Sequence, residues 1–575
     1  MTGDDFIIIY LDVTELLYTY FVCLCQVVIR VNETIIHIPK PSNEPVYQYA
    51  PGSDERKSLI QAIKVIQKKK IEIMPIIGGK KIKTDDLGTV VMPHNHKHIL
   101  ATYHKATPEI VHDAIENAIA LKPVWEDFPW EERASVALKA AELISKKYRF
   151  TLNAATMLGQ SKNVYQAEID AACEIIDFLR FNAYYMQKIY SDQPDTSPGT
   201  LNRLEYRPLE GFIFATTPFN FTAIAGNLPT APAIMGNVVL WKPASTALLS
   251  NNLLMEIFME AGFPSGVINF LPGSGELIGN IILTDKRLAG VHFTGSTPVF
   301  SKFWKMISDN LHIYDSYPKL VGETGGKNFI FVHSSADADA VATAIVRGAF
   351  EYQGQKCSAA SRLYIPISLW ASVKSIVQNM LKEITMGDVE DFSNFINAVI
   401  DKPAFNTISD YIEKARHSKE ATIVCGGKTN CSKGYFIEPT IIETSNPHYV
   451  TMEEEIFGPL LTVYVYKDEL FEETLRICDQ TSPYALTGAI FAQDRQAIVT
   501  TTKILRQAAG NFYINDKPTG AVVGQQPFGG ARCSGTNDKS GSYLNLLSFV
   551  SPRTIKENLL PPTEYKYPFL EKENA

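Results

Sequence analysis

The sequence predicts an α/β protein built from two series of parallel strands that alternate with helices. Short apolar runs recur about a helix's length apart, which is the pattern of βαβ crossovers in a parallel sheet. The chain has 575 residues, of which 45% are hydrophobic and 20% charged. This length and composition allow two or more domains with substantial cores. No internal repeat or low-complexity linker interrupts the alternation.

The first series follows two largely helical stretches at residues 56–67 and 108–144. Its predicted elements are strands at 212–215, 238–241, 267–271 and 291–293, with helices at 248–261 and 298–307.

The second series begins after Lys319. One face of its first helix carries Val341, Ile345, Ala349 and Tyr352, and this helix leads the chain to Cys357. Its predicted elements are strands at 329–332, 363–365, 422–424, 460–466 and 489–491, with helices at 341–352, 369–381, 403–416 and 497–509.

Charge and cysteine usage exclude several classes of protein. A net charge of −8 argues against a general nucleic-acid binder, and no Lys/Arg block is interleaved with aromatics. The eight cysteines include no CxxC pair and no nearby His pair, so neither a zinc site nor a disulfide framework is predicted. A reducing compartment fits this pattern.

The N-terminal region is apolar from residue 6 to 31, but Asp12 and Glu15 interrupt it. Its longest uncharged run, residues 16–29, is too short to span a bilayer. The acidic start MTGDD matches neither a secretory signal nor an arginine-rich presequence. We interpret this region as an extension outside the main fold, or else as an error in the gene model.

A thiol and a carboxylate indicate the chemistry. Cys357 lies in the small-residue turn EYQGQKCSAASR, and Glu323 lies upstream in the glycine turn GETGGKN. A cysteine can form a covalent acyl intermediate, and a glutamate can activate the water that releases it.

Two glycine turns suggest phosphate binding to different degrees. GSGELIG has a spacing one residue too long for the dinucleotide fingerprint, so a plain strand–helix turn is favoured. In FTGSTPVF, the amides of Gly295, Ser296 and Thr297 precede a helix that Pro298 suits. This second turn fits a pyrophosphate site or an ordinary capped helix.

Three polar residues at predicted strand ends or turns have both a functional and a structural interpretation. Asn220 in TPFNF is either an oxyanion donor or an amide that holds a turn. Lys242 in VLWKPAS is either a ligand at the carboxyl edge of the sheet or a solvated lysine. Glu455, beside Phe457, either holds a nicotinamide ribose or belongs to a surface acidic run.

The ordered motifs TPFNF, WKPAS, FTGS, GETGGK, GQKCSA, EEIFGP and QPFGGARCSG resemble those of the aldehyde dehydrogenase superfamily over residues 43–552. The resemblance implies a Rossmann-type NAD-binding domain, an α/β catalytic domain and a small β oligomerisation flap. Longer strings such as AEIDAACEIIDFLRFN and AFEYQGQKCSAASRLY resemble members that oxidise L-glutamate γ-semialdehyde to L-glutamate in proline degradation.

The resemblance also implies a domain plan and partners. It predicts an extension at 1–42, an NAD-binding domain at 43–318 with an oligomerisation hairpin near 192–207, a catalytic domain at 319–532, and a return at 533–575 with an oligomerisation strand at about 544–552. It implies a homo-oligomer, and from the charge, the short apolar run and the cysteine spacing no nucleic-acid partner, membrane insertion or metal is expected. It implies the mitochondrial matrix, with the cytoplasm as the alternative because no presequence is evident.

The implied catalytic residues are Cys357 as nucleophile, Glu323 as the base for hydrolysis, and Asn220, which with the Cys357 N–H forms the oxyanion hole. The implied cofactor is NAD. Ser245 stands where many relatives carry an acid that rejects a 2′-phosphate, so some NADP use is expected. The implied cofactor contacts are Thr217, Lys242, Gly295, Ser296, Thr297, Pro298, Val299, Glu455 and Phe457.

The implied substrate site binds the α-carboxylate through Ser358 and the backbone of Gly520 and Ala521. Some members have Ser in place of Ala521, so this chain lacks one hydroxyl. Phe221 and Phe528 would flank the aliphatic chain, and Glu174 would face the ammonium group.

Three alternatives remain open at this point. The protein could oxidise another semialdehyde or an aliphatic aldehyde, or it could be a catalytically inactive relative that serves as a structural protein. It could also be a cysteine hydrolase, although no His lies near the Cys357 turn to act as its base.

Overall fold

A computed structural model describes residues 35–572, and from residue 39 onward these residues form one compact unit. Most of the expected N-terminal extension, residues 1–34, lies outside the described residues. None of the helices in residues 35–572 combines the length and the apolar character that a membrane span requires.

The first sheet has seven strands in the order β11-β10-β7-β8-β9-β2-β3. The five from β11 to β9 are parallel, and β2 and β3 add an antiparallel edge. All four strands predicted for the first series are present. The strands are β2 (Ile76–Ile77), β3 (Lys80–Lys81), β7 (Phe212–Thr216), β8 (Val238–Lys242), β9 (Ile268–Phe270), β10 (Leu288–Thr294) and β11 (Lys319–Glu323).

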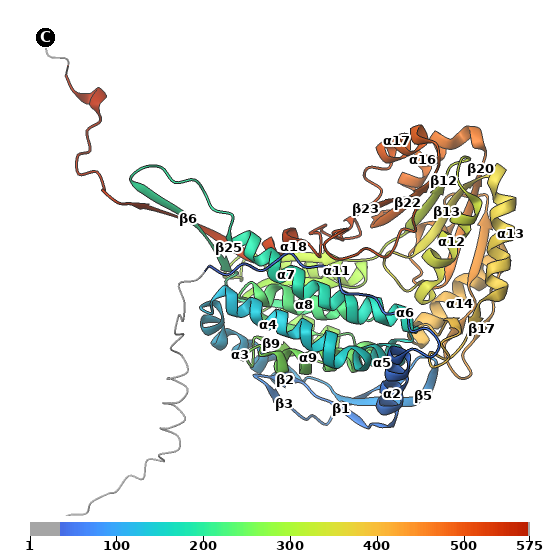
Figure 1. Cartoon of the computed structure of the whole chain (residues 1–575), viewed down its shortest axis with the longest axis horizontal. Helices are drawn as coiled ribbons and strands as arrows, with labels where there is room; N and C mark the ends of the chain where they lie inside the picture. The colour runs from blue at the N-terminus through green and yellow to red at the C-terminus, as the bar shows by residue number, and fades with distance from the viewer. Residues whose placement is uncertain (1–34, 573–575) are drawn as a thin grey trace, which may run out of the picture. The chain divides into compact units, whose positions relative to one another are not determined.

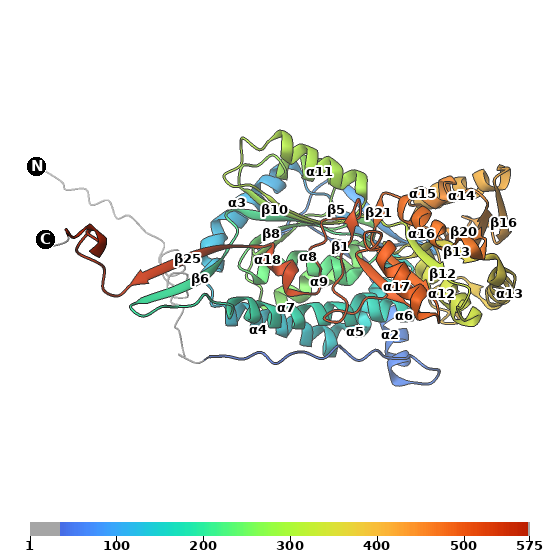
Figure 2. The same ribbon diagram turned by 90° about the horizontal axis from the view of Figure 1, so that it is seen from above.

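Helices cover both faces of this sheet (Figure 2). The helices α3 and α11 lie on one face, and α8 and α9 lie on the other with α4, α5 and α7 beyond them. The helices are α3 (Pro108–Glu126), α4 (Trp130–Leu143), α5 (Arg149–Gln160), α7 (Glu174–Tyr190), α8 (Thr222–Ile234), α9 (Leu248–Ala261), α10 (Gly275–Ile282) and α11 (Thr297–Asp309).

The second sheet has the order β16-β19-β20-β13-β12-β22-β23, and all neighbours except β16 and β19 are parallel. The two faces of this sheet carry separate apolar cores. The elements are β12 (Asn328–Val332), α12 (Ala338–Phe350), β13 (Ala360–Pro366), α13 (Ile367–Glu383), α14 (Lys402–His417), β16 (Ala421–Cys425), β19 (Thr440–Thr444), β20 (Leu460–Tyr466), α16 (Phe471–Gln480), β22 (Thr487–Phe491), α17 (Arg495–Ile504) and β23 (Asn511–Ile514).

Figure 1 shows the two sheets with their helices in different parts of the compact unit. The strand β11 pairs with β10 and therefore belongs to the first sheet, although the predicted boundary at residue 318 assigns it to the second domain. We propose that the boundary lies in the short connection between Glu323 and Asn328 instead.

A smaller sheet and a helix precede the first large sheet. In this sheet β5 (Asn95–His104) pairs with β1 (Ile71–Ile73) and β4 (Leu87–Met92), and α2 (Asp54–Lys68) confirms the helix predicted at 56–67. The stretch 108–144 was predicted as largely helical. It forms two helices, α3 and α4, which a short break at Pro129 separates. Pro129 has no N–H to donate and is the N-cap of α4.

The hairpin predicted near 192–207 is wrong in its first half, because residues 192–199 form no strand and the rest belongs to a two-stranded ribbon. In it β6 (Thr200–Pro208) pairs antiparallel with β25 (Val550–Asn558), as Figure 1 shows. A strand was predicted near 544–552. The first half of that prediction is wrong, because these residues belong to helix α18 (Tyr543–Leu547). The side chain of Ser542 caps this helix and Leu546 is buried, so helical burial outweighs the strand-like sequence.

Candidate active site

Two cavities meet at Cys357. One has a volume of about 630 Å³ and lies at the carboxyl ends of β7, β8 and β10, and the other has a volume of about 380 Å³. Phe293, Thr294 and Cys357 line both cavities. The thiol can therefore be reached from two sides, as a nucleophile between a cofactor and a substrate must be.

A strained turn presents Cys357. The helix predicted at 341–352 ends at Phe350, because Tyr352, Gln353 and Gly354 have φ of 51°, 55° and 66°. Left-handed conformations cost free energy for residues other than glycine and persist where the surroundings compensate. Here the Tyr352 hydroxyl donates to a buried carbonyl at 2.9 Å, and the Gln353 amide donates to another at 2.8 Å.

The Cys357 thiol has a raised pKa. Burial is the main cause, the carboxylates of Glu323 and Glu455 add to it, and a hydrogen bond from the Ser358 N–H opposes it. The resulting pKa is about 12, so the thiol is protonated at neutral pH in this structure. Because the thiolate is the nucleophile, the thiol must lose its proton before it attacks.

Glu323 is the last residue of β11 and lines the smaller cavity. Burial raises the pKa of its carboxyl well above the ordinary value, although a hydrogen bond from the Gly530 N–H at 3.3 Å and the charge of Lys539 lower it. A Cβ at Gly529 would lie 3.1 Å from Glu323 Oε1, so glycine leaves space for the carboxyl. A raised pKa makes the ionised Glu323 carboxylate a stronger base than an ordinary glutamate.

Asn220 follows β7, is buried, and lines the larger cavity together with Cys357. Its Nδ2 donates to the Gln355 carbonyl at 3.0 Å, which orients the amide beside the nucleophile turn. Asn328, which we did not single out, donates to the carbonyls of Cys357 at 2.7 Å and Ala359 at 2.8 Å. It stands in the GETGGKN motif, but nothing in that string shows where its side chain points.

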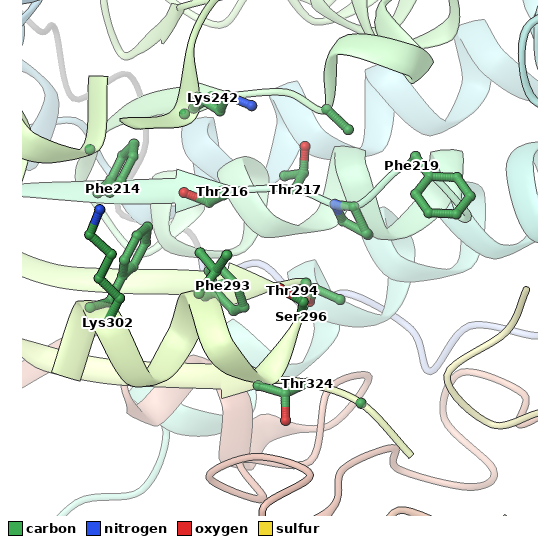
Figure 3. Close-up of a pocket in the computed structure, with 18 of the residues that line it drawn as sticks. Phe214, Thr216, Thr217, Phe219, Lys242, Phe293, Thr294, Ser296, Lys302 and Thr324 are labelled. Carbon is green, nitrogen blue, oxygen red and sulfur yellow. The ribbon is translucent and has the colours of Figure 1, made fainter. Parts of the chain in front are cut away.

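Most of the predicted cofactor residues line the larger cavity. Figure 3 shows Thr217, Lys242 and Ser296 around it. Two predicted contacts do not line it: Thr297 and Pro298 lie in the first turn of α11, where the Thr297 hydroxyl accepts a hydrogen bond from Gly325. The predicted cofactor residues that line the larger cavity are Thr217, Lys242, Gly295, Ser296, Val299, Glu455 and Phe457.

This cavity fits a dinucleotide by its donors and acceptors. Burial lowers the pKa of Lys242 to about 8 and raises that of Glu455 to about 7. The Glu455 carboxylate is oriented by the Gly326 N–H, 2.7 Å from its Oε1. Ser296 is the N-cap of α11 and makes no side-chain cap bond, so its hydroxyl and the helix N-terminus are available to a phosphate. GSGELIG forms the capped start of α10, and its Gly275 and Gly279 also line this cavity.

The predicted substrate residues all line the smaller cavity. The hydroxyls of Ser358 and Thr519 are 2.7 Å apart, and Gly520 has φ of 96°, which favours glycine. Glu174 Oε2 is buried without a hydrogen-bond partner, and burial raises the pKa of this carboxyl well above the ordinary value. The set comprises Ser358, Gly520, Ala521, Phe528, Phe221 and Glu174.

Sequence reasoning missed a group of buried charges beside this cavity. Lys162 forms an ion pair with Asp170, and Lys356 Nζ lies 3.7 Å from the same carboxylate. The Lys162 ammonium lies 4.3 Å from the centroid of the Phe221 ring, and this cation–π contact holds the ring in place. The sequence did offer one signal for this group, because Lys356 directly precedes Cys357. In residues 35–572 no group of His, Cys, Asp and Glu could hold a metal ion.

Comparison with known proteins agrees with this geometry. A family model described as "Aldehyde dehydrogenase family" matches residues 82–555. The chain is 55% identical over 537 residues to a mitochondrial Delta-1-pyrroline-5-carboxylate dehydrogenase of Dictyostelium discoideum, covering 93% of this chain and 96% of the relative. It is 48% identical to the mitochondrial protein of the same name from Homo sapiens, over 92% of this chain and 95% of that one.

A solved structure gives the same result. The Delta-pyrroline-5-carboxylate dehydrogenase from Mycobacterium tuberculosis, bound with NAD, has a TM-score of 0.91 and 49% identity. The match covers 94% of this chain and all of that chain. With its two α/β units, its flap-like ribbon and this extent of similarity, the chain belongs to the aldehyde dehydrogenase family.

Proposed function

We propose that this protein catalyses the NAD-dependent oxidation of L-glutamate γ-semialdehyde, the open form of Δ1-pyrroline-5-carboxylate, to L-glutamate in proline degradation. The observation that carries the proposal is the position of Cys357 between a dinucleotide-sized cavity and a smaller one that Glu174 and Ser358 also line. The relatives named as Delta-1-pyrroline-5-carboxylate dehydrogenases support the substrate, since the similarity extends over more than nine tenths of the chain.

The first half of the reaction forms an acyl-enzyme. Cys357 gives its proton to a solvent water and its sulfur attacks the aldehyde carbon, so a C–S bond forms, the carbonyl π bond breaks and its oxygen becomes an alkoxide. The Asn220 amide and the Cys357 N–H stabilise that alkoxide, and one such donor contributes about 3 kcal/mol. NAD, when bound, supplies the acceptor for the hydride that leaves this carbon, and Cys357 then carries a thioester.

The second half releases glutamate. Glu323 accepts a proton from a water, whose oxygen attacks the thioester carbonyl. The C–S bond breaks and the Cys357 thiolate leaves. Because Glu323 lines the smaller cavity and not the larger one, it would activate this water from the substrate side of the nucleophile.

Binding is divided between the two cavities. Lys242 and Glu455 would hold the two riboses of NAD, and the N-terminus of α11 would bind its pyrophosphate. In the smaller cavity Ser358 and the Gly520–Ala521 backbone bind the α-carboxylate. The unpartnered Glu174 oxygen gives the ammonium group an acceptor.

A substrate panel tests the proposal. We expect NADH formation with glutamate γ-semialdehyde at a kcat/KM far above that with propanal, and a higher kcat/KM with NAD than with NADP. Equal or better turnover of propanal would indicate a general aldehyde dehydrogenase. Cofactor binding without any turnover would indicate a protein with a structural role.

Assembly and location belong to the same proposal. The β6–β25 ribbon has exposed edges that suit pairing with a second copy of the chain, so we propose a homo-oligomer. Sedimentation of the full chain would show a monomer if this is wrong. Relatives named as mitochondrial support a mitochondrial location, which fractionation of the source cells tests against the cytoplasm.

A further inference from the structure

We propose that Asn43 is a positioning residue that ties the substrate-anchoring loop, residues 518–526, to helix α7. In this way it sets the affinity for an aldehyde that carries an α-amino and an α-carboxylate group. The inference rests on the proposed function and adds a residue to it. Asn43 belongs to a segment at residues 43–49, here termed the N-terminal strap, which lies outside the family match at 82–555.

The amide of Asn43 makes three hydrogen bonds, one to helix α7 and two to the loop at 518–526. Its Nδ2 donates to Asp177 Oδ2 on α7 and to the Val523 carbonyl in the loop, each at 2.8 Å. Its Oδ1 accepts from Gln525 Nε2 at 2.8 Å. Both N–H groups and the oxygen are therefore used, and two of the three bonds reach the loop.

The strap is itself fixed by buried ionic contacts. The Glu44 N–H donates to Asp177 Oδ1 at 2.7 Å, and the Glu44 carboxylate pairs with Arg149 and Arg180, each at 2.6 Å. At its far end the Tyr49 hydroxyl donates to Glu168 at 2.6 Å. Because several contacts hold the strap in place, Asn43 keeps its position without the loop. Asn43 can therefore fix the position of the loop.

These bonds connect the two groups of atoms that recognise the substrate. On α7, Asp177 lies three residues after Glu174, so both side chains project from the same face of the helix. The loop carries Gly520 and Ala521, and Asn43 lines the cavity between them and the helix. Without Asn43 the Val523 carbonyl loses its donor and the loop loses its tie to α7. The carboxylate anchor then no longer keeps a fixed distance from the ammonium acceptor.

The test compares two aldehydes on the full-length enzyme. In Asn43→Ala we expect the KM for glutamate γ-semialdehyde to rise about tenfold, as loss of hydrogen bonds to buried groups implies. We expect its kcat and the kcat/KM for propanal, which uses neither anchor, to stay within about twofold. Hydrogen exchange in residues 518–526 should become faster. Gln48→Ala, which removes an exposed amide from the same strap, is the matched control and should change none of these values.

A second variant separates positioning from stability. Asn43→Asp places two carboxylates together and should lower the melting temperature. Adding Asp177→Asn restores a donor–acceptor pair between strap and helix, but it returns no donor to the Val523 carbonyl. The double variant should therefore regain thermal stability yet keep the raised KM. Recovery of the KM together with stability would overturn the role of the loop bond.

The outcomes also separate this inference from the proposed function. If the wild-type enzyme oxidises glutamate γ-semialdehyde and Asn43→Ala leaves its KM unchanged, the inference is wrong and the function stands. If the wild-type enzyme does not oxidise it, the function is wrong. Hydrogen exchange then decides the inference: faster exchange of residues 518–526 in Asn43→Ala supports the tie, and unchanged exchange refutes it.

Discussion

Replacing Glu323 by Gln should separate the two halves of the reaction. Glutamine keeps the size of the side chain and an oxygen for the Gly530 N–H, 3.3 Å away in the wild-type structure, but it cannot accept a proton from water. A positioned general base contributes about 10²- to 10⁴-fold to a rate. We therefore expect hydrolysis of the thioester to slow by that factor while acyl-enzyme formation continues, because no proton transfer to Glu323 is needed there.

Rapid mixing of this variant with NAD and the semialdehyde provides the assay. One NADH per active site should appear in a fast burst, followed by a steady-state rate about 10²- to 10⁴-fold below wild type. Intact-protein mass should show an acyl adduct that is absent from the wild-type enzyme. Glu323→Asp, which retains a carboxylate, is the control and should show a smaller defect. A wild-type steady-state rate without a burst or adduct would remove Glu323 as the base.

Three further predictions follow from the site. Asn220→Ala should lower kcat about 10²- to 10³-fold, because an oxyanion donor is lost, with NAD affinity retained in a fluorescence titration; a loss below about threefold would contradict this role. Lys242→Met should weaken NAD binding at least about tenfold by calorimetry, because it removes a charged donor from the cavity, and unchanged affinity would exclude this contact. The raised pKa of Glu323 implies that its carboxyl stabilises the fold when protonated, and that this stability is lost as pH rises through the raised pKa. Glu323→Gln should therefore gain melting temperature relative to wild type as pH increases, and a constant difference from pH 5 to pH 8 would refute the burial cost.

The strands could be predicted because strands buried in a parallel sheet appear in the sequence as local apolar runs. β7, β8, β12 and β20 are continuous apolar runs bounded by turn residues, and each was predicted within one residue of its ends. Helix ends were harder. The pattern of α12 continues through Tyr352, yet the chain leaves the helix after Phe350 because distant carbonyls bond the side chains of the turn.

Residues in ordered motifs could be predicted, whereas those that act through distant contacts could not. Cys357 and Glu323 each stand in a distinctive glycine or small-residue string. Asn43 lies in an undistinguished stretch, and its partners Asp177 and Val523 are 134 and 480 positions away. The membership of β11 in the first sheet likewise depends on its pairing with β10, which no local pattern indicates.

The central claim is that the Cys357 sulfur, where the two cavities meet, holds the substrate covalently until hydrolysis. The most direct measurement is NADH and glutamate formation from glutamate γ-semialdehyde by the wild-type protein and by Cys357→Ala, alongside NAD affinity. We predict equal amounts of NADH and glutamate from the wild type. The variant should form no NADH above background while binding NAD with wild-type affinity. Turnover by Cys357→Ala at a rate near that of the wild type would contradict the claim.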